Sequence, residues 1–153
     1  MGPSADGRAV PYHEGPRLQE DPIVGIDGMA DARDLLDRYA RAWETFDGDL
    51  WVSLFSEEAE YSPDPFEPPL VGHNAIRASM LDASRTQEQM EMTFERHWVS
   101  GPTVLAAWHA SYVRTTDRAR VRVAGFLVLE TDADGTIARH RAWWHRRETP
   151  ATG

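Results

Sequence analysis

The sequence predicts an α+β domain in which three helices cover the concave face of a bent antiparallel sheet. Residues 29–84 carry apolar side chains mainly at helical spacing, whereas residues 87–148 contain four long runs rich in β-branched and aromatic residues. Short turns join these runs, which favours an antiparallel meander. Helices followed by strands in a chain of this size indicate a single α+β domain.

The composition excludes several classes of protein. The chain has 153 residues, of which 41% are hydrophobic and 27% charged, as in an ordinary globular domain. Its formal net charge of -9 argues against binding to the phosphates of a nucleic acid. Cysteine is absent, which excludes disulfides and cysteine-ligated zinc. No run approaches the roughly 18 apolar residues of a membrane helix. We therefore expect a cytoplasmic protein without a nucleic acid or membrane partner.

The chain divides into three parts. Residues 1–28 are rich in proline, glycine and charge and show no sustained hydrophobic period, so we expect an extended arm there. Residues 29–148 form the predicted domain. Residues 149–153 form a short C-terminal tail.

The first helix is predicted over residues 29–46. Its apolar residues recur at helical spacing and place Tyr39 and Trp43 on the buried stripe. Asp31 is available as an N-cap, because an aspartate side chain can accept hydrogen bonds from the first free amides of a helix. This segment is the clearest amphipathic helix in the chain.

Shorter elements follow the first helix. A second helix is expected over residues 48–56, a brief strand over 59–63 and a proline-rich turn after it. The third helix is expected over residues 72–84 and places three apolar side chains inward: Ile76, Met80 and Leu81. The four long strands are expected at residues 87–100, 103–115, 118–131 and 135–148.

Asp64 stands between two prolines in the stretch EYSPDPFEPP. Next to Tyr61 and Phe66, its carboxylate would lose hydration, which raises the pKa of an acid towards that of a useful general base. The flanking prolines would fix where it points. The alternative is a turn, because aspartate next to proline commonly opens one.

His140 lies in the alternating run ARHRAWWHR. The alternation places Ala138, His140, Ala142 and Trp144 on one face. The two small alanines would leave room for a ligand beside His140, which is then a candidate acid, base or hydrogen-bond donor. The arginine-bearing face suits solvent or a dimer contact. A histidine that is merely packed in the core is the alternative.

The motifs DRYARAW, GDLWVSLFSEEAEY, PDPFEPPLVGHNAIR and DGTIARHRAWW follow one another in this order. The series resembles the nuclear transport factor 2-like superfamily, in particular its SnoaL-like and ketosteroid-isomerase-like members, over roughly residues 30–147. The resemblance implies a cone-shaped fold with a deep apolar pocket between helices and curved sheet, often in a homodimer packed through the sheet. Because this scaffold hosts many reactions, the fold does not name the reaction.

The resemblance to ketosteroid isomerases extends to single residues. Tyr39 matches the tyrosine that donates to the developing oxyanion, and Asp64 matches the general-base aspartate. Pocket positions of that family are matched by His140, Trp144, Trp108 and Tyr112. The chain departs from the family at residues 123–126, Val-Ala-Gly-Phe, where the second oxyanion donor, a protonated acid, is missing.

The candidate ligand-binding residues are mostly aromatic. Several rings lining one pocket would favour a flat or polycyclic apolar ligand. The set comprises Trp43, Phe55, Tyr61, Phe66, Met80, Trp108, Tyr112, Phe126 and Trp144.

We expect neither a metal nor a nucleotide cofactor. The sequence has no pair of histidines at helical spacing, and His140 and His145 fall on opposite faces of their strand. It also lacks a phosphate loop, a dinucleotide glycine pattern and a G-x-S-x-G turn.

The resulting hypothesis is a cofactor-independent enzyme for a hydrophobic, oxygenated metabolite. Asp64 would abstract a proton next to a carbonyl, and Tyr39 and His140 would stabilise or reprotonate the enolate. Cyclisation, isomerisation and dehydration, as in polyketide cyclases of secondary metabolism, share this machinery. Two alternatives stay open: an epoxide hydrolase, with Arg139 or Arg141 in an Asp-Arg-Asp set, and a domain that only binds a ligand.

Overall fold

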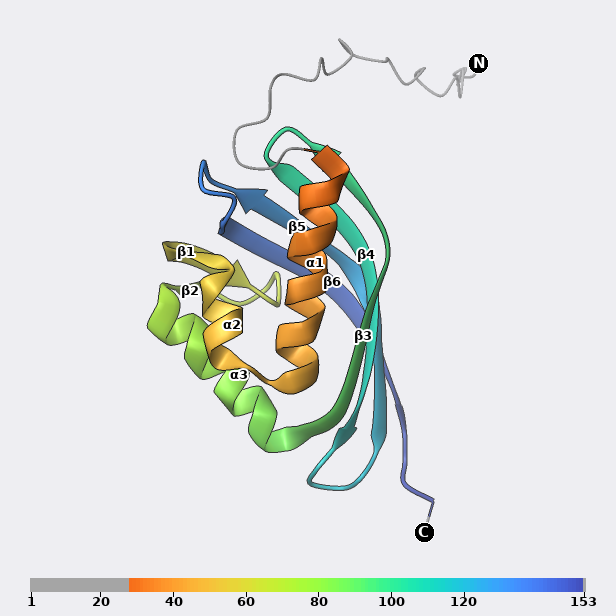
Figure 1. The fold of residues 1–153 in the computed structure, drawn as a ribbon. Helices are drawn as coiled ribbons and strands as arrows, with labels where there is room; N and C mark the ends of the chain where they lie inside the picture. The colour runs from red at the N-terminus through yellow and green to blue at the C-terminus, as the bar shows by residue number, and fades with distance from the viewer. Residues whose placement is uncertain (1–27, 153) are drawn as a thin grey trace, which may run out of the picture.

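The structure is a computed structural model that describes residues 28–152, as three helices and a six-stranded sheet (Figure 1). The predicted arm lies outside the described residues except for Gly28, at which the first helix begins. In chain order the elements are α1 (Gly28–Thr45), α2 (Gly48–Ser53), β1 (Phe55–Ser62), β2 (Leu70–Val71), α3 (His73–Thr86), β3 (Gln87–Ser100), β4 (Thr103–Arg114), β5 (Arg120–Thr131) and β6 (Ile137–Thr149).

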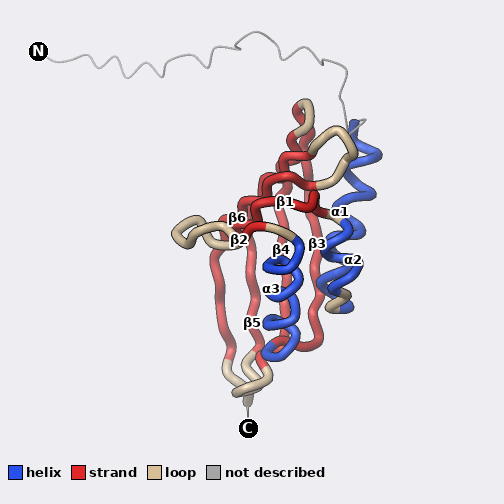
Figure 2. The backbone as a smooth tube through the Cα atoms, turned by 90° about the vertical axis from the view of Figure 1, so that its left-hand side faces the viewer, coloured by secondary structure: helices blue, strands red, loops and turns tan. Residues whose placement is uncertain are grey.

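The sheet has the strand order β2-β1-β6-β5-β4-β3. Strands β3 to β6 form the predicted antiparallel meander. Strand β1 instead pairs parallel to β6, which places Tyr61 opposite His140, and β2 adds an antiparallel edge next to β1. Neither β2 nor the parallel pairing was expected from the sequence. All three helices lie on one side of the curved sheet, which confirms the predicted fold class (Figures 1 and 2).

Two helix boundaries differ from the sequence-based expectation. Helix α1 begins at Gly28, so Asp31 lies within its first turn and is not the N-cap. Helix α2 is shorter than predicted, because Phe55 already belongs to β1. Asp47 caps α2, and its Oδ1 accepts a hydrogen bond of 3.0 Å from the amide of Leu50.

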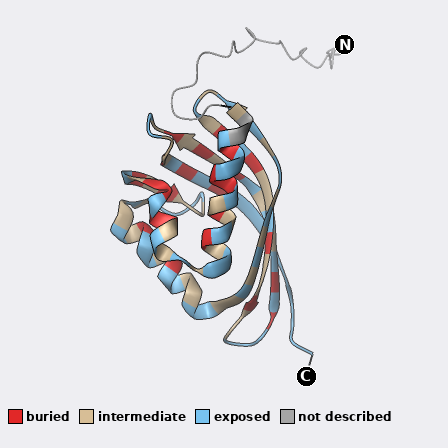
Figure 3. Cartoon of the chain, viewed as in Figure 1, coloured by how far each residue is buried: buried red, intermediate tan, exposed pale blue. Residues whose placement is uncertain are grey.

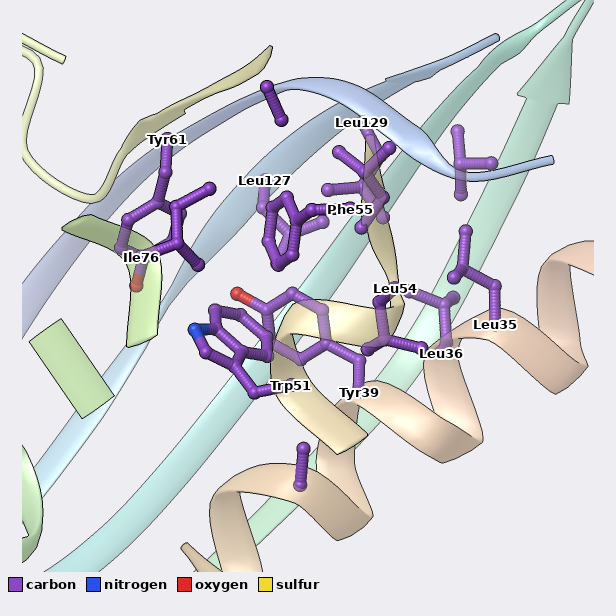
Figure 4. Close-up of a cluster of buried hydrophobic side chains, with 14 of the residues drawn as sticks. Leu35, Leu36, Tyr39, Trp51, Leu54, Phe55, Tyr61, Ile76, Leu127 and Leu129 are labelled. Atoms are coloured by element: carbon purple, nitrogen blue, oxygen red, sulfur yellow. The ribbon is translucent and has the colours of Figure 1, made fainter. Parts of the chain in front are cut away.

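The core forms where α1 and α2 face the sheet (Figures 3 and 4). Trp51 of α2 is fully buried and packs edge-on against Tyr39, Phe55 and Tyr61. Helix α3 buries Ile76 and Met80, as predicted. Leu81 is 52% exposed, so its predicted inward position is wrong. It follows Met80 directly, and consecutive helical residues point about 100° apart.

None of the helices in the described part of the chain combines the length and the apolar character needed to cross a membrane.

Alternation along β6 places His140 and Ala142 on the buried concave face, whereas Arg139, Arg141 and Trp143 are exposed. The predicted face of His140 is therefore confirmed. The same alternation would place Ile137 on the exposed face with Arg139 and Arg141, but Ile137 is fully buried. The register shifts between Glu130 and Thr131 on the paired strand, and such a shift moves a side chain to the other face.

Gly125 of β5 lies at a tight approach between two strands. A Cβ atom placed on Gly125 would lie 1.9 Å from the carbonyl oxygen of Trp143 and 2.8 Å from the Cα of Trp144. Both obstacles are backbone atoms and cannot rotate away. Only glycine allows β6 to run this close to β5 at the level of Trp108 and Trp144, the register partners of Gly125.

We predict that Gly125→Ala lowers the free energy of unfolding by about 2 kcal/mol or more, because the added methyl group must displace the backbone of β6. Urea denaturation followed by circular dichroism measures the change. Ala124→Ser, an exposed change at the adjacent residue, should alter the free energy of unfolding by no more than about 0.5 kcal/mol. Equal stability of the Gly125→Ala and wild-type proteins would contradict the close approach.

Candidate functional site

A pocket of about 290 Å³ opens on the concave face of the sheet. Helix α1, the end of β1 and strands β3 to β6 all contribute to its wall. The residues that line it are Tyr39, Trp43, Tyr61, Pro63, Gln87, Met90, Met92, Trp108, Ala110, Tyr112, Val123, His140, Ala142, Trp144 and Arg146. Aromatic and aliphatic side chains predominate, as in sites for apolar small molecules.

Tyr39 and His140 form a buried pair at the inner end of the pocket. The hydroxyl of Tyr39 and Nε2 of His140 share a hydrogen bond of 2.8 Å, and the two rings lie nearly parallel. Both residues are less than 5% exposed. The bond joins α1 to β6 across 101 residues of sequence. A buried hydroxyl and a buried imidazole would each be costly without such a partner.

Tyr61 completes the inner end. Its ring centroid lies 4.5 Å from that of His140, and its hydroxyl forms no hydrogen bond within residues 28–152. In the view of Figure 4 the polar atoms of Tyr39, Trp51 and Tyr61 lie at the same end of the hydrophobic cluster. The Tyr61 hydroxyl is therefore available to a ligand.

The inner end of the pocket is uncharged near neutral pH. Burial lowers the pKa of His140 from its ordinary value of 6.5 to about 3, and the nearby backbone of His140 and Ser62 opposes this only in part. Nδ1 of His140 is buried without a hydrogen-bond partner in the described chain. Burial also raises the pKa of Tyr39, with a smaller contribution from Tyr61, and raises the pKa of Tyr61 itself. All three groups are neutral.

The pocket lining contains no carboxylate, and Arg146 supplies its one permanent charge. Within residues 28–152, no three side chains of histidine, aspartate or glutamate gather into a group that could hold a metal ion. The chemistry available inside is therefore hydrogen bonding by neutral groups, with a cation at the outer end.

Asp64 lies next to the pocket but does not line it. Its Oδ1 accepts a hydrogen bond of 2.9 Å from the amide of Phe66, and its carbonyl accepts one from Glu67. This is the turn geometry that an aspartate commonly adopts. The preceding residue, Pro63, lines the pocket and accepts a hydrogen bond of 2.6 Å from the indole of Trp144. The loop from Pro63 projects away from the sheet (Figure 2).

The structure brings together most of the predicted site residues. Tyr39 and His140 lie in hydrogen-bonding contact, and five of the predicted ligand-binding residues line the same pocket: Trp43, Tyr61, Trp108, Tyr112 and Trp144. Asp64 is the predicted catalytic residue that stands apart from the lining. The catalytic roles of these residues stay predictions.

Four predicted ligand-binding residues lie outside the pocket. Phe55 and Met80 are buried in the core and do not line it. Phe66 is 93% exposed at the tip of the loop, because the Asp64 turn directs the chain outward. Phe126 is 47% exposed and stacks on Trp98 on the outer face of the sheet, since the alternation of β5 points it away from the helices. The pocket positions predicted for these residues are wrong.

Several lining residues were not predicted, chiefly Arg146 and the side chains that β3 contributes: Gln87, Met90 and Met92. Arg146 could have been found from the same alternation that placed His140, Ala142 and Trp144 on one face, continued by one further step. The pairing of β3 with β4 is irregular at residues 88–91, so simple alternation does not show which β3 side chains face the pocket.

The sequence model of the SnoaL-like domain matches residues 36–140 of this chain. No protein with a curated description matches the chain. Solved structures do match, and one is a protein from Catenulispora acidiphila with a ketosteroid isomerase-like fold in complex with trimethylamine. It is 14% identical, with a TM-score of 0.66, and the match covers 72% of this chain and 84% of that one.

Two further structures show the range of proteins on this fold. SalBIII, an epoxide hydrolase/cyclase-like enzyme in pyran ring formation in the polyether salinomycin, is 20% identical with a TM-score of 0.68, over 76% of this chain and 92% of its own. A computationally designed 17-OHP binder is 16% identical with a TM-score of 0.66, over 78% of this chain and 98% of its own. Likenesses at such identities show the fold alone. The sequence match over residues 36–140 shows that the chain belongs to the SnoaL-like domain family.

Acid should destabilise the protein through His140. The unfolded chain takes up a proton near pH 6.5, whereas the folded chain resists protonation of His140 down to about pH 3. This part of the stability is complete above pH 6.5 and is lost as the pH falls towards 3. We predict that the free energy of unfolding falls by about 2 kcal/mol between pH 7 and pH 5 because of His140 alone.

Urea unfolding at both pH values measures the effect in the wild type and in His140→Gln. The variant should lose most of the wild-type pH dependence in this interval. His145→Gln, an exposed change on the same strand, should keep it. Parallel pH profiles for the wild type and His140→Gln would show that His140 does not titrate as its burial requires.

Proposed function

We propose that this member of the SnoaL-like domain family is a cofactor-independent enzyme for a flat, hydrophobic ketone or related carbonyl compound. It would transfer a proton at the carbon next to the carbonyl, as cyclisation, isomerisation and dehydration of oxygenated metabolites require. The observation that carries this proposal is the buried Tyr39–His140 hydrogen bond at the inner end of an aromatic pocket. It supplies what an enolate needs, a fixed neutral hydrogen-bond donor among mostly apolar walls.

The substrate oxygen would bind at the hydroxyls of Tyr39 and Tyr61. When a proton leaves the adjacent carbon, negative charge collects on this oxygen, and hydrogen bonds to it strengthen. In one tautomer of His140, the Nε2–H group donates to the Tyr39 oxygen and leaves the Tyr39 hydroxyl proton for the substrate. In the other tautomer Tyr39 donates to His140, and Tyr61 is the remaining donor.

Asp64 is the proposed base. No carboxylate lines the pocket, and Asp64 follows the lining residue Pro63 directly. Its Oδ1 must leave the amide of Phe66 before it can reach a substrate, so the turn has to rearrange when a ligand binds. Hydrogen bonds that serve catalysis are often formed only in the complex with substrate.

An epoxide hydrolase is less well supported. That chemistry would need an Asp-Arg-Asp set around the pocket, and the lining offers no acid. Arg139 and Arg141 are exposed on the outer face of β6, and Arg139 pairs with Glu60 and Glu130. Ligand binding without catalysis is the outcome to expect if proton transfer is not observed.

The proposal predicts that the protein exchanges the acidic protons of 2-tetralone, a flat bicyclic ketone, for deuterium faster than buffer alone. Tyr39→Phe should slow this exchange about 100-fold or more, because one oxyanion donor contributes roughly this much. Asp64→Asn should slow it by a similar or greater factor through loss of the base. Proton NMR in D₂O follows the exchange.

Glu67→Gln, an exposed change in the same loop, is the matched control and should exchange at the wild-type rate. Exchange that survives in Asp64→Asn but not in Tyr39→Phe would remove Asp64 from the mechanism. Saturable binding of 2-tetralone without exchange would overturn catalysis and leave a binding domain.

We also propose that two copies associate through the outer face of the sheet. Four large apolar side chains are exposed there: Trp98, Leu105, Phe126 and Trp143. Further along this face, β3 carries Glu91 and Glu95, whereas β5 and β6 carry Arg122 and Arg147. A two-fold axis parallel to the strands would set the acidic β3 of one copy over the basic β5 and β6 of the other. The outer face is therefore complementary in charge to the same face of a second copy.

Sedimentation velocity tests this association. The wild type should sediment as a dimer, and Phe126→Glu, which places a charge in the centre of the apolar surface, should shift it towards monomer by at least tenfold in dissociation constant. Leu81→Glu, an equally exposed leucine on the helical side, should leave the dimer intact. A monomeric wild type would contradict the proposed association.

A further inference from the structure

Arg146 differs in character from every other residue that lines the pocket. The remaining lining residues are apolar, aromatic or neutral polar groups, so the one carboxylate that faces Arg146, that of Glu148, lies outside the lining. An arginine at an otherwise uncharged pocket suits a carboxylate or phosphate, because its planar head can donate two parallel hydrogen bonds.

The position of Arg146 along β6 sets it at the end of the pocket opposite to Tyr39. His140, Ala142, Trp144 and Arg146 are successive residues on the concave face. Arg146 follows His140 by six positions along the extended strand, a rise of roughly 20 Å. The Arg146 side chain can extend part of the way towards Tyr39. A ligand of two or three fused rings would span the remaining distance between the guanidinium group and the Tyr39 hydroxyl.

Arg146 is free to exchange its present partner for a ligand. Its Nε lies 3.5 Å from Oε2 of Glu148, and its side chain is 47% exposed. The other oxygen of Glu148 is held at 2.5 Å by Arg114, which also pairs with Asp117. An exposed ion pair of this kind contributes little to stability, and a ligand anion can replace it at small cost.

The inner end of the pocket would reject a charged group. His140 is neutral, and no cation lies near it that could compensate for the lost hydration of an anion. On a chain with a formal net charge of -9, an anionic ligand also needs a local cation to approach. The two ends of the pocket therefore differ in what they accept.

We infer that the pocket takes a flat, hydrophobic molecule with an acidic group at one end, bound by Arg146, and a carbonyl or hydroxyl oxygen at the other, bound at Tyr39 and Tyr61. This inference rests on the proposed function and narrows it to acidic substrates. Arg146 is then a residue that determines specificity, and it takes no part in the proton transfer.

Isothermal titration calorimetry with 6-hydroxy-2-naphthoate and its methyl ester tests the inference, since the two probes share the ring system and differ in charge. The wild type should bind the acid about tenfold more tightly than the ester at low salt. Arg146→Gln should bring the two dissociation constants within about twofold of each other, and Arg146→Lys should keep part of the preference. Added salt should weaken binding of the acid only.

Arg85→Gln is the control, because Arg85 is an exposed arginine of α3 that does not line the pocket. It should keep the tenfold preference. Equal binding of acid and ester to the wild type, or an equal loss of preference in both variants, would overturn the inference. If neither probe binds, the pocket itself fails as a binding site. Binding with the expected preference but without exchange of 2-tetralone would overturn the proposed catalysis alone.

Discussion

The hydrogen bond between Tyr39 and His140 is the constraint on which the rest of the domain depends. It connects the central helix to the strand that joins β1 to the meander. Because a buried phenol and a buried imidazole both need a partner, the rotation of α1 over the sheet is fixed at this level. Apolar contacts alone would tolerate small shifts of the helix. The same bond sets the depth of the pocket, since its two side chains form the inner wall.

The parts of the fold that follow from local periodicity could be predicted from the sequence. Tyr39 and Trp43 recur at helical spacing, and His140 and Trp144 alternate on one strand, so each was placed on its correct face. Features that depend on non-local pairing could not be predicted. The parallel contact of β1 with β6 and the register shift beside Ile137 leave no trace in the spacing of apolar residues. Composition alone also cannot distinguish an aromatic pocket residue from an aromatic residue such as Phe126 on the opposite face of the sheet.

The pocket owes its open volume to small residues set among large ones. Along the rows of the sheet, Ala142 pairs with Leu127, and Gly125 stands between Trp108 and Trp144. A larger side chain at Ala142 would project into the space beside His140, and Gly125 accepts no side chain at all. Six tryptophans in a chain of this length could have filled the interior. Three of them, Trp43, Trp108 and Trp144, line a cavity instead. Glycine and alanine at positions 125 and 142 leave this space open.

The stiffness of the chain around Asp64 has a structural consequence that does not require catalysis. Its carboxylate holds the amide of Phe66 and closes a turn between two prolines. That turn presents the carbonyl of Pro63 to the indole of Trp144 and fixes one wall of the pocket. To act as a base, Asp64 would have to break its hydrogen bond to the Phe66 amide, which helps to shape the pocket. If Asp64 is the base, substrate binding and opening of this turn are coupled, because a substrate that recruits Asp64 must also supply contacts that hold Pro63 and Trp144 in place.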